Sequence, residues 1–135
     1  MNPADRLRSI LEARDDVRLA YLFGSAARGQ ERAASDVDLA VLFERLPDAR
    51  DLDLLATSLE AAAGRPVDLV VLDTAPPLLT RQVVATGRVL VCRDEEERAR
   101  FEARAASRYL DTAHLRQVQH AYLRERADAH RARSS

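Results

Sequence analysis

Four short apolar segments, separated by amphipathic stretches, constrain the fold of this chain most strongly. The β-branched and aliphatic character of these segments predicts strands at Val17–Phe23, Val37–Phe43, 67–72 and Arg88–Cys92. Apolar residues at helical spacing predict helices at 3–14, 51–63 and Pro77–Thr86. Strands that alternate with helices predict an α/β (α+β) fold in which helices flank the sheet. The link between the first two strands is too short for a full crossover, so we expect a mixed sheet.

A long C-terminal helix is expected from Asp94 to about residue 130, with Asp94 and Glu97 spaced as a capping box. The chain has 135 residues, which is room for one compact domain. We therefore expect a single domain over residues 1–135, with a core at about 17–92 and the C-terminal helix at about 94–130.

The composition indicates a packed, cytoplasmic protein. With 47% hydrophobic and 32% charged residues, the chain can bury a core and cover it with charge. The only cysteine, Cys92, can form neither an internal disulfide nor a zinc site with other cysteines. Apolar runs are too short to span a bilayer, and the first residues lack the apolar region of a signal peptide. The net charge of −1 and 4% aromatic residues argue against direct nucleic-acid binding.

Two aspartates at the start of the second expected strand carry the clearest chemical signal. Asp36 and Asp38 lie on one face of that strand, whereas Val37, Leu39 and Val41 lie on the other, apolar face. Their Cα atoms would be roughly 6 to 7 Å apart, which suits carboxylates that share divalent cations. Oxygen ligands without histidine or cysteine favour Mg²⁺, or Mn²⁺, over Zn²⁺.

A glycine-serine pair precedes these aspartates, where the first expected strand ends. Gly24 allows the backbone to approach a ligand closely, and the Ser25 hydroxyl and nearby N–H groups can bind an anion at a helix N-terminus. Arg28, one turn further on, carries a planar guanidinium that suits phosphate. Gly24, Ser25 and Arg28 therefore form a candidate phosphate-binding site.

A third carboxylate is expected if two cations serve phosphoryl or nucleotidyl transfer. The strand at 67–72 offers Asp68 at its start and Asp73 at its far end. If this strand lies beside the Asp36/Asp38 strand with matched starts, only Asp68 reaches the cations. We therefore predict Asp68 as the third ligand.

The Gly24-Ser25 pair, ten further residues and then Asp36-x-Asp38 before an apolar strand resemble the nucleotidyltransferase motif of the DNA polymerase β superfamily. Within that superfamily the chain most resembles the minimal nucleotidyltransferase (MntA-like) proteins. The resemblance extends over about residues 17–92 and includes the strand with Asp68.

The resemblance implies Mg²⁺-dependent transfer of AMP from ATP to a hydroxyl group. It implies that Asp36 and Asp38 hold two Mg²⁺ ions and that Asp68 holds the one beside the incoming hydroxyl. Gly24 and Ser25 would hold the β- and γ-phosphates.

The resemblance also implies a partner, because MntA-like proteins are antitoxins of HEPN-domain ribonuclease toxins (HepT) and add AMP to a toxin tyrosine. A hetero-oligomer with such a toxin is then expected. Enzymes of the superfamily that modify antibiotics or RNA usually have a second domain for the acceptor, for which 135 residues leave no room. Two alternatives stay open: an antitoxin that neutralises by binding alone, and a nucleotidyltransferase that modifies a small molecule such as an antibiotic.

Overall fold

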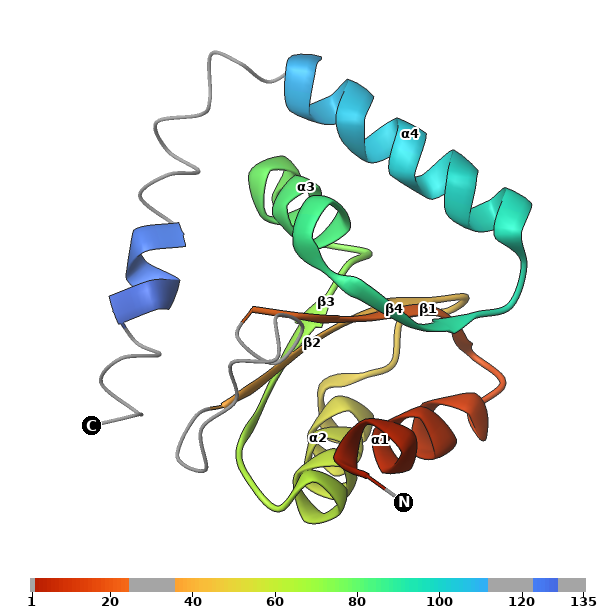
Figure 1. Cartoon of the computed structure of the whole chain (residues 1–135), viewed down its shortest axis with the longest axis vertical. Helices are drawn as coiled ribbons and strands as arrows, with labels where there is room; N and C mark the ends of the chain where they lie inside the picture. The colour runs from red at the N-terminus through yellow and green to blue at the C-terminus, as the bar shows by residue number, and fades with distance from the viewer. Residues whose placement is uncertain (1, 25–35, 112–122, 129–135) are drawn as a thin grey trace.

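The computed structural model describes residues 2–24, 36–111 and 123–128, and it confirms a mixed sheet flanked by helices (Figure 1). The elements follow in the order α1 (Pro3–Glu12), β1 (Val17–Phe23), β2 (Val37–Phe43), α2 (Ala49–Ala63), β3 (Val67–Val71), α3 (Pro77–Thr86), β4 (Arg88–Cys92) and α4 (Glu95–Asp111). The strands were thus predicted correctly, except that β3 ends one residue earlier, at Val71.

The strand order in the described part of the sheet is β3-β2-β1-β4. β1 is antiparallel to both of its neighbours, β2 and β4, whereas β3 is parallel to β2. Helix α2 connects the parallel pair, because parallel strands need a crossover that returns the chain to the same end of the sheet. The starts of β2 and β3 therefore lie at the same edge.

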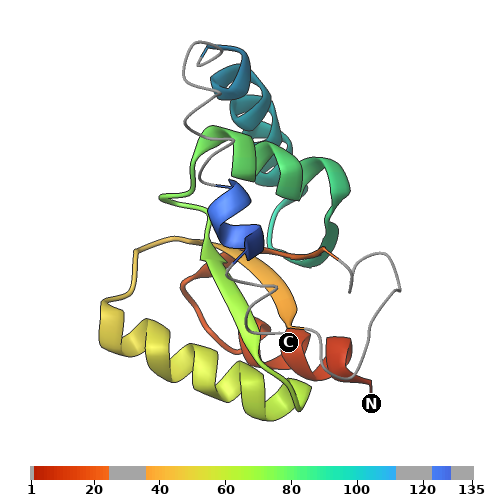
Figure 2. The ribbon, with the colours of Figure 1, turned by 90° about the vertical axis from the view of Figure 1, so that its left-hand side faces the viewer.

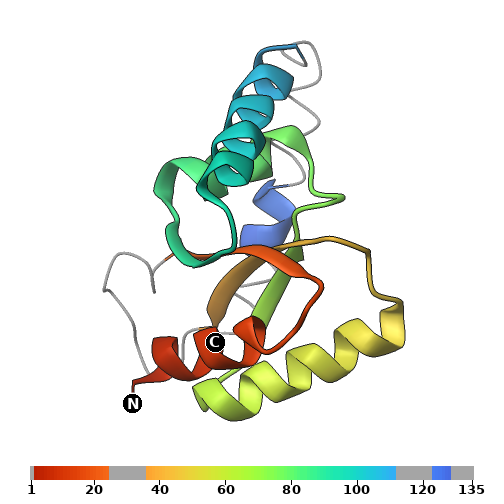
Figure 3. The ribbon, with the colours of Figure 1, turned by 90° about the vertical axis from the view of Figure 1, so that its right-hand side faces the viewer.

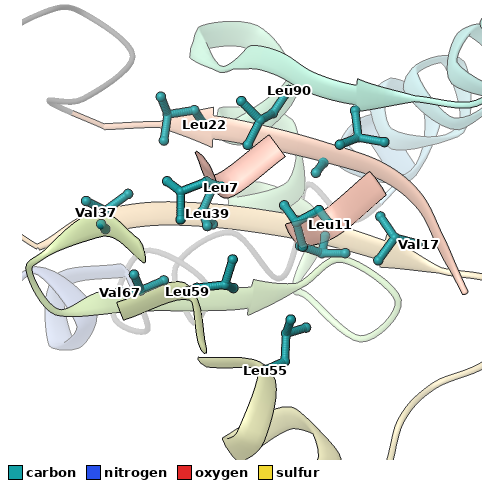
Figure 4. Packing of buried hydrophobic residues seen from close by; sticks show 14 of the residues in the cluster. Leu7, Leu11, Val17, Leu22, Val37, Leu39, Leu55, Leu59, Val67 and Leu90 are labelled. Carbon is teal, nitrogen blue, oxygen red and sulfur yellow. The ribbon is translucent and has the colours of Figure 1, made fainter. Parts of the chain in front are cut away.

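Each face of the sheet packs against one pair of helices, which gives three layers (Figures 1 and 3). Leu7 and Leu11 of α1 and Leu55 and Leu59 of α2 belong to the larger apolar cluster on one face (Figure 4). The second cluster, on the other face, includes Leu79 and Val83 of α3 and Phe101 of α4.

The side chains of β2 alternate between these two clusters. Val37, Leu39 and Val41 belong to the α1/α2 cluster, as the sequence predicts. Ala40 and Leu42 belong to the α3/α4 cluster, so both faces of β2 are covered. Because side chains alternate along a strand, Asp38 also points to the α3/α4 face.

Helix α2 begins at Ala49, two residues before the expected start at 51. Asp48 explains the difference, because its side chain accepts a hydrogen bond of 2.8 Å from the backbone N–H of Asp51 and so caps the helix. The helix ends at Gly64, as expected, with that glycine at a φ of 73°. Helix α1 ends at Glu12, two residues before the expected end at 14.

The structure describes two parts of the long C-terminal helix expected over 94–130, Glu95–Asp111 and 123–128, and residues 112–122 and 129–130 lie outside the described residues. Helix α4 starts at Glu95, and the Asp94 side chain accepts a hydrogen bond of 3.0 Å from the N–H of Glu96. Glu97 does not complete the capping box, because its carboxylate pairs with Arg18 at 3.1 Å.

Residues 123–128 are also helical, but they lie to one side of α4 instead of along its axis (Figures 1 and 2). Leu123 packs against the α3/α4 cluster, which draws this segment toward the sheet. Across the described ranges, none of the helices combines the length and the apolar character that crossing a membrane requires.

Candidate active site

A pocket of about 290 Å³ lies where the end of β1 meets the starts of β2 and β3. Three parts of the chain line it. The sheet contributes Phe23, Gly24, Asp38 and Asp68, helix α3 contributes Leu79, Gln82 and Thr86, and the C-terminal segment contributes Leu123, Arg126 and Ala127. The pocket therefore combines carboxylates on its floor with an apolar and amide-bearing wall.

Asp38 and Asp68 are direct neighbours on parallel strands. In the register of β2 and β3, Val37 pairs with Val67 and Asp38 pairs with Asp68. Adjacent strands are about 4.8 Å apart, so the two carboxylates rise side by side from the pocket floor. The matched strand starts, on which the choice of Asp68 depended, are thus found in the structure.

Asp73 lies just beyond the opposite end of β3, where its side chain is hydrogen-bonded to β2. Its Oδ1 accepts a hydrogen bond of 3.0 Å from the backbone N–H of Phe43, at the end of β2. It also lines a different cavity, beside Phe101 and Arg104 of α4. The structure therefore places Asp68, and not Asp73, beside Asp38.

Asp36 directly precedes β2 and is only 3% exposed. It shares the strand face of Asp38 by alternation, but it is not among the residues that line the pocket. Asp36 is therefore a buried carboxyl group two residues from Asp38, and its part in the site stays a prediction.

Gly24 is required at the pocket edge for two reasons. Phe23 pairs with Asp38 across β1 and β2, which brings the next residue, Gly24, against the Asp38 side chain. A Cβ atom at Gly24 would collide with Oδ2 of Asp38. Gly24 also has a φ of 70°, in the left-handed region that residues with a side chain rarely adopt. The absence of a side chain at Gly24 therefore leaves room for the Asp38 carboxylate.

Ser25 and Arg28, predicted to bind phosphate with Gly24, lie outside the described residues. Of the predicted phosphate site, the structure shows Gly24 alone. The role of Ser25 and Arg28 stays a prediction.

Sequence reasoning missed Arg126, which forms an ion pair with Asp68. Its Nη2 donates a hydrogen bond of 2.6 Å to Asp68 Oδ2, and the two side chains are 26% and 19% exposed. The residues are 58 positions apart, and every basic residue of the chain is an arginine, so no pattern distinguishes Arg126 from the others.

The donor chemistry of the pocket fits a hard divalent cation. Asp38 and Asp68 supply carboxylate oxygens on one face, with Asp36 two residues before Asp38. Within residues 2–24, 36–111 and 123–128, no three acidic, histidine or cysteine side chains are already gathered as a metal site. The Asp68 carboxylate is paired with Arg126 instead. Asp38 and Asp68 are therefore two neighbouring carboxylates of the kind that Mg²⁺ or Mn²⁺ prefers, and the set of Asp36, Asp38 and Asp68 as metal ligands stays a prediction.

A sheet with paired aspartates beside a glycine turn is the arrangement of a nucleotidyltransferase domain. The profile of the family described as "Polymerase beta, Nucleotidyltransferase" matches residues 5–96. The chain belongs to this family.

Among characterised relatives, the protein adenylyltransferase MntA of Shewanella oneidensis is 40% identical over 74 residues. This match covers 55% of the chain and 53% of the relative. The chain therefore spans about half the length of that protein.

Two solved structures share the fold over most of the chain. A chain of a toxin-antitoxin crystal structure with AMP-PNP has a TM-score of 0.76 and 30% identity, and covers 89% of this chain and 97% of its own. A chain from the complex of the tri-AMPylated Shewanella oneidensis HEPN toxin with its MNT antitoxin has a TM-score of 0.72 and 28% identity. That match covers 90% of this chain and 95% of the other.

Proposed function

We propose that this protein is an Mg²⁺-dependent adenylyltransferase that transfers AMP from ATP to a tyrosine hydroxyl of a HEPN-domain toxin and thereby acts as an antitoxin. The observation that carries the proposal is the in-register pair Asp38 and Asp68 on the floor of a pocket whose edge is the Gly24 turn. The relatives' names support the acceptor and the nucleotide, because they include an adenylyltransferase, an AMP-PNP complex and an AMPylated HEPN toxin.

In the proposed reaction, the chain's own residues bind and orient the two reactants. Asp36 and Asp38 would hold two Mg²⁺ ions, or Mn²⁺, against the triphosphate, and Asp68 would hold the ion on the acceptor side. Bound there, the ions would offset the phosphate charge and lower the pKa of the acceptor hydroxyl. Gly24 and Ser25 would orient the β- and γ-phosphates, with Arg28 as an additional phosphate ligand, so that the hydroxyl attacks the α-phosphorus in line with the departing pyrophosphate.

The pocket wall is consistent with a substrate that is larger than the phosphates alone. Leu79 on α3 and Leu123 on the C-terminal segment present apolar surface, and Gln82 and Thr86 add an amide and a hydroxyl. Ligand sites commonly combine such apolar surface with a few polar groups that fix orientation.

The test is an intact-mass measurement of the HEPN-domain protein expected to be encoded beside this chain. After incubation with ATP, Mg²⁺ and this protein, the partner's mass should rise by one or more AMP units, and peptide mapping should place them on tyrosine. Asp36→Asn and Asp38→Asn should each abolish the additions. Asp53→Asn, an exposed aspartate on α2, is the matched control and should leave them unchanged.

Two results would contradict the proposal. If the Asp36→Asn/Asp38→Asn double variant still neutralised the toxin, the protein would act by binding alone. If the partner gained no AMP while an added antibiotic did, the acceptor would be a small molecule.

A further inference from the structure

The Arg126–Asp68 ion pair is built into the pocket and is not a loose surface contact. Both side chains are largely shielded from solvent, at 26% and 19% exposed, and both line the pocket together with Gly24 and Asp38. The Nη2 to Oδ2 distance of 2.6 Å is that of a charge-assisted hydrogen bond. The pair therefore holds a positive charge beside a carboxylate at the place where we propose that a cation binds.

The segment that carries Arg126 is anchored on the sheet by a second contact. Leu123 packs against the α3/α4 cluster, and residues three apart share one face of a helix. Arg124 and Glu125, in contrast, are exposed. Leu123 and Arg126 therefore line the pocket, whereas the other charged residues of this helical segment are exposed.

A guanidinium and a divalent cation cannot both occupy the same carboxylate oxygen, because like charges at contact distance repel each other strongly in a partly buried pocket. Arg126 uses Oδ2 of Asp68. A metal ion that binds to Asp68 must therefore displace the guanidinium or share the carboxylate with it at a cost in affinity.

We propose that Arg126 is an internal counterion that occupies the acceptor-side cation position at Asp68 in the metal-free protein and competes with the divalent cation for this carboxylate. This inference rests on the proposed function in its assignment of Asp68 as a metal ligand. The inference adds a regulatory contact to that function. Residues 123–128 stay bound to Asp68 through Arg126 while no metal ion is present, and they are released from Asp68 when the ion binds. The acceptor hydroxyl must reach the same ion, so release of Arg126 also clears space for the acceptor.

The competition is measured on the full chain without ATP or partner, with Mn²⁺ as the probe. Titration followed by electron paramagnetic resonance of free Mn²⁺ gives the affinity. Arg126→Ala should bind Mn²⁺ about fivefold more tightly than the parent protein, as expected for the loss of a competing ion pair of moderate strength. Arg124→Ala removes the same charge from the exposed face of the same segment, and it should leave the affinity unchanged.

A second readout follows the guanidinium itself. The Arg126 Nη2–H signal in a low-temperature ¹H–¹⁵N spectrum, assigned by its loss in Arg126→Lys, should move from a paired to a free position as Mg²⁺ is added. In an Asp68→Asn background the signal should already be in the free position, and Arg126→Ala should no longer change Mn²⁺ affinity.

The proposed competition would be overturned if Arg126→Ala bound Mn²⁺ with the same affinity as the parent protein, or did not bind it at all. It would also be overturned if Arg124→Ala gained as much Mn²⁺ affinity as Arg126→Ala. None of these results depends on AMP transfer, which the intact-mass assay measures separately. A protein that transfers AMP but shows no competition would retain the proposed function without this contact.

Discussion

Gly24 and Asp38 lie so close together that any side chain on the first would occupy the position of the second residue's carboxylate. The relationship follows from the pairing of Phe23 with Asp38 across β1 and β2, which continues to the turn at Gly24. The turn and the carboxylate are therefore parts of one local structure, although they are separated in sequence by residues 25–37.

Gly24→Ala should lower stability and abolish AMP transfer. The left-handed φ of 70° costs a side-chain-bearing residue about 1 kcal/mol, and the added Cβ must also push the Asp38 carboxylate aside. Urea unfolding and the intact-mass assay measure the two effects. Gly64→Ala is the matched control, because Gly64 has a similar φ of 73° but no atom within 4 Å of the position that a Cβ would take. It should lose about 1 kcal/mol and keep its activity; an equal loss of activity in both variants would contradict a specific role of Gly24.

Asp68→Asn should reduce the rate of AMP transfer by about 100- to 1000-fold, the usual effect of removing one charged group that stabilises a transition state. Initial rates at saturating Mg²⁺ measure it. Asp73→Asn makes the same change at the other end of β3, where the side chain accepts a hydrogen bond from Phe43. This variant should transfer AMP at close to the parental rate and lose about 1 kcal/mol of stability. The opposite result, with Asp73 needed for transfer and Asp68 dispensable, would reverse the assignment.

Arg93→Ala should destabilise the protein by about 1 kcal/mol without affecting the pocket. The Arg93 guanidinium donates to the carbonyls of Val17 at 3.0 Å, Glu12 at 2.8 Å and Arg14 at 3.0 Å, which ties the end of α1 to the start of β1. Thermal or urea unfolding checks the loss. Arg88→Ala changes an exposed arginine at the start of β4, the strand that Arg93 directly follows, and it should change stability much less. A similar loss in both variants would show that the carbonyl contacts are unimportant.

Asp16 should contribute stability that disappears in acid. Two hydrogen bonds from the Arg14 guanidinium, at 3.0 and 2.8 Å, hold the pKa of Asp16 below its ordinary value of 3.8. A carboxyl with a lowered pKa in the folded state stabilises that state above its unfolded pKa and loses the contribution as pH falls through its folded pKa. The difference in unfolding free energy between the parent and Asp16→Asn should therefore be constant from about pH 5 to 7 and shrink below about pH 4. A difference that does not change with pH would exclude this ion pair as its source.

Sequence patterns were sufficient to predict the strands and to place Asp68, but not Asp73, beside Asp38, and the reasons are local. Alternation along β2 places Val37, Leu39 and Val41 on the opposite face from Asp38. The assumption that β2 and β3 start at the same level then places Asp68 next to Asp38. The ends of helices were less predictable. Helix α2 begins at Ala49 because Asp48 caps it, whereas the apolar pattern used for the prediction starts later.

Contacts between distant parts of the chain were not predictable from pattern. Arg18 forms an ion pair with Glu97, and Arg126 forms one with Asp68. The partners are so far apart in sequence that the periodicity of a helix or a strand cannot relate them. In a chain whose basic residues are all arginines, each acidic residue has many possible partners, and only the packing of α4 and Leu123 selects among them.

The three-layer arrangement places the pocket carboxylate Asp38 on one face of the sheet and the larger apolar cluster on the other. Odd-numbered positions of β2 meet α1 and α2, whereas even-numbered positions meet the helices beside the pocket. Substitutions in the cluster beneath α1 and α2 can move the Asp38 carboxylate only by shifting the backbone of β2. Changes in the α1/α2 layer can therefore tune the thermal tolerance of this protein while the residues that line the pocket stay the same.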